Sequence, residues 1–201
     1  MSATEEMTPT AHLAALKEAP EAGAFQKLVT GMEYDDSDEA YEALVEQAEE
    51  AGDDEEFPEA AKAFRDLSVL AWVRSDNRMM ENFAIQALYY GTIVGFDTLL
   101  GNFTAVWAMW AHVLPTLKPG DRARLQNFAR FGRSFQLGLR KREETDDRVN
   151  AAVTLLAPTF ESLGELNLKK IADRKVDITA DTATLWDEVN KLLAQIETST
   201  T

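Results

Sequence analysis

Residues 79–117 read MMENFAIQALYYGTIVGFDTLLGNFTAVWAMWAHVLPTL, and this stretch decides the fold. Between Glu81 and Lys118 it carries a single formal charge, Asp97. Charged side chains are rarely buried without a partner, so a long stretch almost free of them is expected to form the core. We expect the rest of the chain to cover this stretch as amphipathic helices.

The stretch predicts two helices, and the first spans residues 79–100. Its apolar and small residues recur at the three- and four-residue spacing of a single helix face. Gly91 and Gly95 lie in adjacent turns of this helix. Each costs helix propensity, about 1 kcal/mol, but the missing side chains would let a neighbouring helix approach closely. We therefore predict a tight helix crossing at the two glycines.

The break between the two predicted helices falls at Gly101-Asn102. Both residue types tolerate the left-handed conformation that ends many helices. The second helix, 103–117, is apolar nearly all round. Such a helix must be buried on most sides by the rest of the fold, by a partner chain or by lipid.

The flanking segments carry the signals of further helices. Ser37 is a predicted N-cap, Phe57-Pro58 opens a helix, and Pro158 should interrupt a helix that begins near residue 146. No run of alternating apolar and polar residues predicts a strand. The chain therefore predicts an all-α multi-helix bundle of roughly seven to nine helices around the buried apolar pair.

The net charge of −15 belongs to one segment. Residues 1–60 hold 18 acidic and 2 basic residues, whereas residues 61–201 hold 17 acidic and 18 basic residues. We interpret residues 1–56 as an acidic helical arm and residues 57–201 as a helical bundle core with a C-terminal amphipathic helix. Repulsion from nucleic acid is expected of the acidic part alone.

The chain has no cysteine, which excludes disulfides, thiolate metal sites and cysteine nucleophiles. A salt-loving (halophilic) source would also give an acidic protein free of cysteine, but that adaptation should coat the whole surface. The first residues, Met1 to Glu6, form neither a basic region nor an apolar run, so no signal peptide is predicted. We expect a protein of the cytoplasm or of a particle assembled inside the cell.

A basic helix is predicted at residues 122–142, which contain seven basic residues and no acid. Its charged side chains could meet acids of this chain or of a partner, phosphates of DNA or RNA, or an anionic membrane surface. The phenylalanines of this helix are expected to face the core, so no aromatic residue lies among the basic ones on the charged face to stack on bases. The candidate contact face consists of Arg122, Arg130, Arg133, Arg140 and Lys141.

Asp97 is the candidate buried charge, because a carboxylate inside an apolar helix is costly unless it is paired. The first interpretation is a buried or half-buried partner for an arginine of the 122–142 helix, or a hydrogen bond near its own helix end. The second is an ion or proton site in a membrane hairpin. The two apolar segments are short for spanning a bilayer, so the membrane interpretation is the weaker one.

Motifs that carry chemistry are missing from the sequence. No Glu-x-x-His pair, phosphate-binding glycine loop or nucleophile elbow occurs. The two histidines, His12 and His112, are far apart, and His112 lies among apolar residues as a packing or capping residue would. We predict no catalytic residues, no cofactor and no metal site.

These patterns predict a non-enzymatic helical structural or scaffolding subunit that self-associates or binds a protein partner. A virion or another large assembly would be one setting for it. The first alternative is a nucleic-acid-associated regulator that binds phosphates through the 122–142 helix. The second is a membrane-associated helical protein.

Overall fold

The computed structural model describes residues 11, 14–16, 18–19, 22–31, 37–113, 127–173, 187, 190–196 and 198. Within these ranges every regular element is a helix, which confirms the all-α prediction. The bounded helices are α2 (Ala22–Thr30), α3 (Asp38–Asp53), α4 (Phe57–Val73), α5 (Asn77–Val94), α6 (Phe96–Val113), α7 (Asn127–Lys141) and α8 (Asp147–Asp173).

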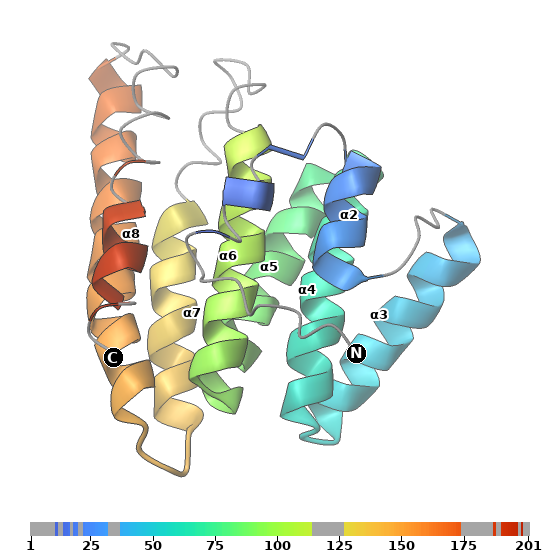
Figure 1. The fold of residues 1–201 in the computed structure, drawn as a ribbon. Coiled ribbons are helices and arrows are strands. Elements are labelled where there is room, and N and C mark those ends of the chain that lie inside the picture. Colours follow the sequence, from blue (N-terminus) through green and yellow to red (C-terminus); the bar gives the residue numbers. More distant parts are fainter. Residues whose placement is uncertain are drawn as a thin grey trace.

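Five of the helices form a row across the molecule. α3, α4, α5, α7 and α8 follow one another, each packed on the next, and α6 and α2 lie on one side of this row (Figure 1). α6 packs against α4, α5 and α8, and α2 packs against α4. α5 packs against α4, α6 and α7.

Helices α3, α5 and α7 run in the same direction. Near the start of α3, the ring of Tyr41 lies 6.4 Å from that of Phe83 in α5, and near its end Gly52 lies against Tyr90. Gly138, near the end of α7, lies against the last turns of α5. α3 and α7 are therefore both parallel to α5, and side chains of each contact it.

Helix α6 is buried on nearly every side. Trp107 and Trp110 expose only 2% and 1% of their surfaces. The Trp110 ring meets Phe131 of α7 at 6.1 Å, and the Trp107 ring meets Phe160 of α8 at 5.9 Å. The apolar helix that the sequence predicts is thus covered by its own chain over the described part, which ends at Val113.

The predicted break at Gly101-Asn102 is wrong, because the chain turns six residues earlier. Gly95 ends α5 with φ 149° and ψ −177°, a backbone conformation that residues other than glycine rarely adopt. Arg142 donates hydrogen bonds to the carbonyl oxygens of Thr92 and Ile93, at 3.0 and 2.8 Å, and so satisfies the end of α5. The helix therefore ends at a glycine that can adopt the required backbone conformation, and Arg142 donates hydrogen bonds to its last carbonyl groups.

Asn102 lies inside α6 and ties three helices together. Its Nδ2 donates to the carbonyl oxygen of Ala61 in α4 at 3.0 Å and to that of Ala87 in α5 at 2.8 Å. The side chain is 1% exposed, so both bonds are shielded from water. This residue, which resembles a helix terminator in the sequence, is a buried cross-link.

The predicted tight crossing is confirmed at Gly91 and wrong at Gly95. A Cβ on Gly91 would lie 3.3 Å from the Cα of Leu99 and 3.2 Å from Nδ2 of Asn102, so α6 approaches α5 too closely for a side chain. Gly95 serves the turn between the helices instead.

Pro158 does not interrupt its helix, contrary to the prediction, since α8 continues to Asp173. A proline in a helix costs about 3 kcal/mol because it removes a hydrogen bond and crowds the preceding turn. The turns around it bury Val153, Leu156 and Phe160 against the core. This packing offsets the cost.

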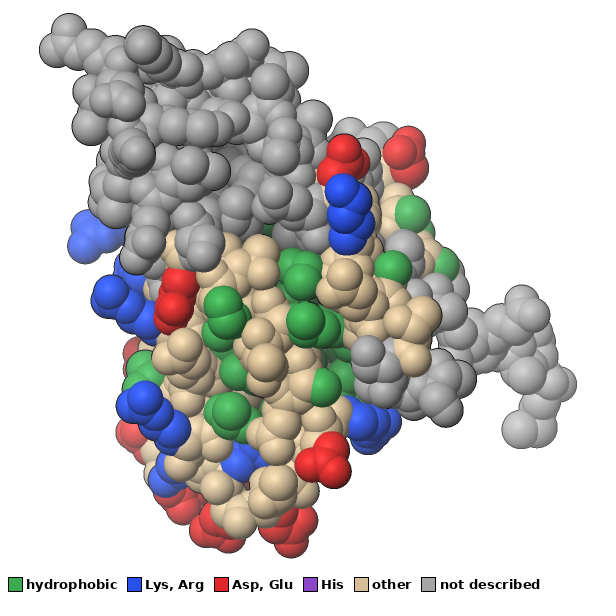
Figure 2. Space-filling model, turned by 90° about the vertical axis from the view of Figure 1, so that its left-hand side faces the viewer, with side chains coloured by type: hydrophobic (Ala, Val, Ile, Leu, Met, Phe, Trp, Pro, Cys, Tyr) green, Lys and Arg blue, Asp and Glu red, His purple; other side chains and the backbone are tan. Residues whose placement is uncertain are grey.

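On the side of the molecule that α8 occupies, charged side chains gather mostly around the edge (Figure 2).

Candidate interaction surface

The basic helix of the sequence corresponds to α7, of which the structure describes Asn127–Lys141. Arg122 lies outside the described residues. Arg130, Arg133 and Arg140 are exposed and make no ion pair or hydrogen bond with any residue in the described part of the chain. These three guanidinium groups are available to a partner.

Lys141 differs from the other candidate residues because it meets the acidic segment. Its Nζ lies 2.9 Å from Oε1 of Glu55, in the turn between α3 and α4, and 5.8 Å from the ring centre of Phe57. The hydrogen bond to Glu55, followed by the charge of Glu55, raises the pKa of Lys141. Lys141 therefore joins α7 to the acidic segment within one chain.

The prediction of a buried Asp97 is wrong. Its side chain is 88% exposed and lies 4.0 Å from Nη1 of Arg148, which belongs to α8 rather than to the basic helix. Because α5 ends at Gly95, Asp97 falls in the first turn of α6, where the helix dipole favours an acid. The predicted helix 79–100 had placed Asp97 near the end of an apolar helix, whereas in the structure it lies near the start of the next one.

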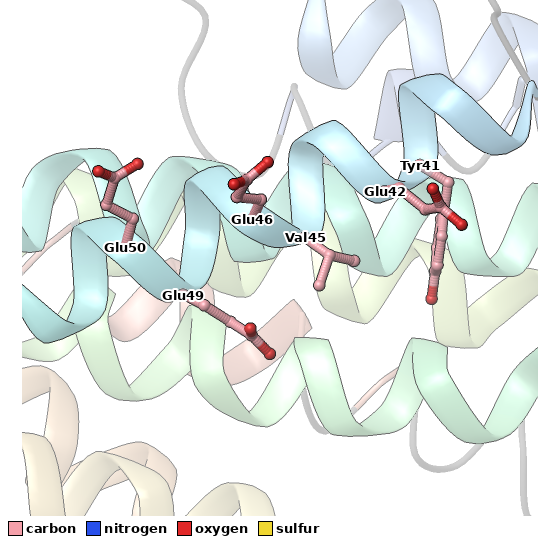
Figure 3. A pocket seen from close by; sticks show the side chains of 6 residues that line it. All are labelled: Tyr41, Glu42, Val45, Glu46, Glu49 and Glu50. Carbon is pink, nitrogen blue, oxygen red and sulfur yellow. The ribbon is translucent and has the colours of Figure 1, made fainter.

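An acidic hollow of about 480 Å³ lies along α3. Figure 3 shows Tyr41, Val45 and Glu49 on one side of the helix, the side that faces α5, whereas Glu46 and Glu50 point to the other side. Burial is the main cause of the raised pKa of Tyr41, with a smaller contribution from Asp76. The phenol is therefore a neutral group in an otherwise acidic wall.

A second hollow, of about 420 Å³, lies between α3 and α5, and its apolar part is formed by Phe64, Phe83 and Tyr90. Glu49 and Asp53 of α3 line it on one side and Gln86 of α5 on the other. Burial is also the main cause of the raised pKa of Tyr90. The floor of this hollow is thus aromatic and uncharged.

The third hollow, of about 490 Å³, lies between α5 and α7. Its walls are Ile85, Gln86 and Tyr89 from α5, and its other lining residues come from α7: Arg130, Arg133, Ser134 and Leu137. Leu137 is 54% exposed, a high value for a large apolar side chain. Basic and apolar surface therefore occur side by side here.

The three hollows form one continuous face, which we call the α3/α5/α7 face. Glu49 lines both the first and the second hollow, and Gln86 lines both the second and the third. One wall of this face is acidic, from α3, and the other is basic, from α7, with α5 between them. Sites for small ligands are enclosed and mostly apolar, whereas these hollows are open and lined in part by charged side chains.

Sequence reasoning identified the basic wall and missed the acidic one. On α3 it noted the apolar residues and treated the acids as a general property of residues 1–60. A signal was present, because Glu42, Glu49 and Asp53 recur with Val45 at the three- and four-residue spacing of one helix face.

Two buried carboxylates, Asp66 and Glu81, also escaped the sequence analysis; they are 3% and 5% exposed. Oδ1 of Asp66 accepts a hydrogen bond from Arg65 Nε at 2.9 Å and forms an ion pair with Arg65 Nη2 at 2.8 Å. Burial nevertheless raises the pKa of Asp66, with the Arg65 charge opposing the shift. Asp66 lies within α4, which is buried nearly all round, so its role is structural.

His112 packs as the sequence predicts, with Nε2 3.0 Å from the carbonyl oxygen of Leu16 and its ring 5.7 Å from Phe25 and 5.5 Å from Trp72. His12 lies outside the described residues. No group of three or more histidines and carboxylates in the described ranges could hold a metal ion. Among the helices that the structure describes, none is both long and apolar enough to cross a membrane.

Comparison with known proteins gives no relative from which a role could be taken. No family model, no curated protein and no solved structure matches the chain. Any function must therefore be argued from the arrangement of its own residues.

Proposed function

We propose that the protein is a non-enzymatic structural or scaffolding subunit that acts through protein contacts made by its α3/α5/α7 face. The observation that carries the proposal is the pair of walls of opposite charge on either side of α5. Glu49 and Asp53 on one wall, and Arg130 and Arg133 on the other, have no ion-pair partner among the described residues. A face with aromatic and apolar surface between charged walls is suited to a protein partner.

The basic wall would also suit phosphates of DNA or RNA, so the test must separate the two classes of partner. A nucleic-acid site would have to tolerate the acidic wall of α3 on the same face, which repels phosphates. A protein partner can satisfy both walls at once. The proposal therefore favours protein.

Sedimentation velocity and a titration with fluorescent DNA and RNA test the proposal together. We expect a species heavier than 22.4 kDa at low salt and no salt-dependent affinity for nucleic acid. Nucleic-acid binding that falls steeply with salt, and is lost in the Arg133→Glu, Arg140→Glu double variant, would overturn the proposal in favour of the regulator. A chain that stays monomeric at every concentration and salt would also contradict it.

A further inference from the structure

A cation, an aromatic ring and an acid meet in the same combination three times in the described part of the chain. The guanidinium of Arg74 lies 4.8 Å from the ring centre of Tyr41 and pairs with Asp38. The other two groups are Lys141 with Phe57 and Glu55, and Arg148 with Phe96 and Asp97. In each group the acid lies within three residues of the ring in the sequence. The ring and the acid both attract the cation, so this chain holds its own cations in a recurring way.

The second hollow, which we call the α3/α5 hollow, has the rings and the acids of such a group. The rings of Phe64 and Tyr90 stack with their centres 5.5 Å apart and only 3° between their planes. The ring of Phe83 lies 6.2 Å from that of Phe64. The three rings therefore form one aromatic surface. No basic residue is among the described residues that line this hollow, so the group lacks its cation.

The acids of the α3/α5 hollow lie next to its rings. Glu49 and Asp53 are exposed, lie about one turn apart on α3 and both line the hollow. A Cβ on Gly52 would lie 2.7 Å from the hydroxyl of Tyr90, so the missing side chain lets the phenol lie against this turn of α3. Burial is the main cause of the raised pKa of Tyr90, and the charges of Tyr89 and Asp53 add to it. The carboxylates and the aromatic surface thus act on the same space.

We infer that the α3/α5 hollow binds an arginine side chain of the partner protein. This inference rests on the proposed function and names the chemistry that the partner presents at this hollow. A guanidinium is planar, so it can stack on an aromatic ring while its N–H groups bond carboxylates, whereas the ammonium of lysine is a compact point charge. Asn82 and Gln86 also line the hollow, and their amide oxygens can accept hydrogen bonds from the remaining N–H groups.

Binding of a single arginine side chain can be measured by NMR on the full chain, because the protein has only four tyrosines. With isotope-labelled tyrosine, the ring signal of Tyr90, assigned with a Tyr90→Phe variant, reports on the hollow. The probes are Nα-acetylarginine amide and Nα-acetylcitrulline amide, which have similar shapes, but the citrulline side chain is uncharged. We expect a saturable shift of the Tyr90 signal with the arginine probe and none with the citrulline probe. The Tyr41 signal should move little, since Arg74 already covers that ring.

Two double variants of α3 show whether the acids of the hollow hold the probe. The Glu49→Gln, Asp53→Asn variant should bind the arginine probe about fivefold more weakly or worse, because two ion pairs are lost. The Glu46→Gln, Glu50→Gln variant removes the same charge from the same helix, but these side chains point away from α5 (Figure 3). This control should bind the probe as the unaltered protein does. All four positions are exposed, so both variants should fold.

Three results would overturn the inference. They are an equal response of Tyr90 to the two probes, including none, an equal loss in the two double variants, and tighter binding of Nα-acetyllysine amide than of the arginine probe. Each would leave the proposed function standing, because a partner protein can contact the rest of the α3/α5/α7 face. A chain that stays monomeric in sedimentation velocity but binds the arginine probe as expected would contradict the proposed function and not the arginine site.

Discussion

Helix α6 and the α3/α5/α7 face show two ways in which this chain treats an unusual stretch of sequence. α6 is apolar nearly all round, and the chain buries it completely, with Trp107 and Trp110 at the centre. α3 and α7 carry an excess of one charge each, and the chain holds them apart on either side of α5. The apolar excess is therefore satisfied within one molecule, whereas Glu49 and Asp53 on one wall and Arg130 and Arg133 on the other have no ion-pair partner among the described residues.

The largest effect on stability is expected from a substitution in the buried helix α6. Trp107→Ala should lower the free energy of unfolding by about 3–5 kcal/mol, because it leaves a cavity in the core. Leu137→Ala is the matched control on the α3/α5/α7 face, where the side chain is 54% exposed, and should change it by less than about 0.5 kcal/mol. Urea unfolding at a concentration low enough to keep the chain monomeric measures both. Equal losses would mean that the two surfaces are equally buried.

Gly95 and Gly101, at the end of α5 and within α6, should respond to substitution in opposite directions. Gly95→Ala should cost about 1–3 kcal/mol, because alanine at φ 149° is strained. Gly101→Ala should instead stabilise the protein by about 0.5–1 kcal/mol, since an added Cβ there meets no atom within 4 Å and alanine favours a helix. Thermal unfolding shows whether each variant is less or more stable than the unaltered protein. The reverse result would indicate that the helix ends at Gly101 rather than at Gly95.

Asp66 gives a smaller effect that depends on pH. Burial raises the pKa of Asp66 in the folded state, so the folded protein keeps this proton to a higher pH than the unfolded chain does. Stability should therefore fall as pH rises from the ordinary value of 3.8 through the raised one. Asp66→Asn removes the charge and should stabilise the protein at neutral pH by about 1 kcal/mol.

The advantage of Asp66→Asn should shrink as the pH falls below the ordinary aspartate pKa, where the carboxyl is protonated in both states. Urea unfolding at a series of pH values measures this difference. An advantage that grows towards acid pH would contradict the account.

The smallest expected effect concerns Asp97. Asp97→Asn should cost only about 0.3–1 kcal/mol, the usual size of an exposed first-turn interaction with the helix dipole. Removing one partner of a buried ion pair would cost about 3–5 kcal/mol, so chemical denaturation separates the two environments. A loss in the larger range would restore the buried Asp97 that the sequence predicts.

The sequence predicts the fold class, the core and several helix ends. Ser37 accepts a hydrogen bond from the backbone N–H of Ala40 as an N-cap should, and α4 begins at Phe57 as predicted. These features depend on local patterns that a single helix displays. Apolar periodicity likewise identifies α6 as the element to be buried.

The sequence does not predict features that depend on contacts between distant residues. The end of α5 is set at Gly95 by the guanidinium of Arg142, which lies far along the chain and has no local signal. The buried role of Asn102 depends on carbonyls of α4 and α5. The α3/α5/α7 face was only half predicted for the same reason, since its acidic wall becomes meaningful only opposite the basic one.

A single cysteine tests the central claim most directly, because the chain has none of its own. Gln86 lines the second and the third hollow, so it lies at the centre of the α3/α5/α7 face. A bulky maleimide attached to the Gln86→Cys variant should therefore abolish the species heavier than 22.4 kDa in sedimentation velocity, whereas the same label on Thr154→Cys, on the exposed side of α8, should leave that species unchanged. An equal loss with both labels, or no loss with the label at Gln86→Cys, would contradict the α3/α5/α7 face as the protein-contact surface.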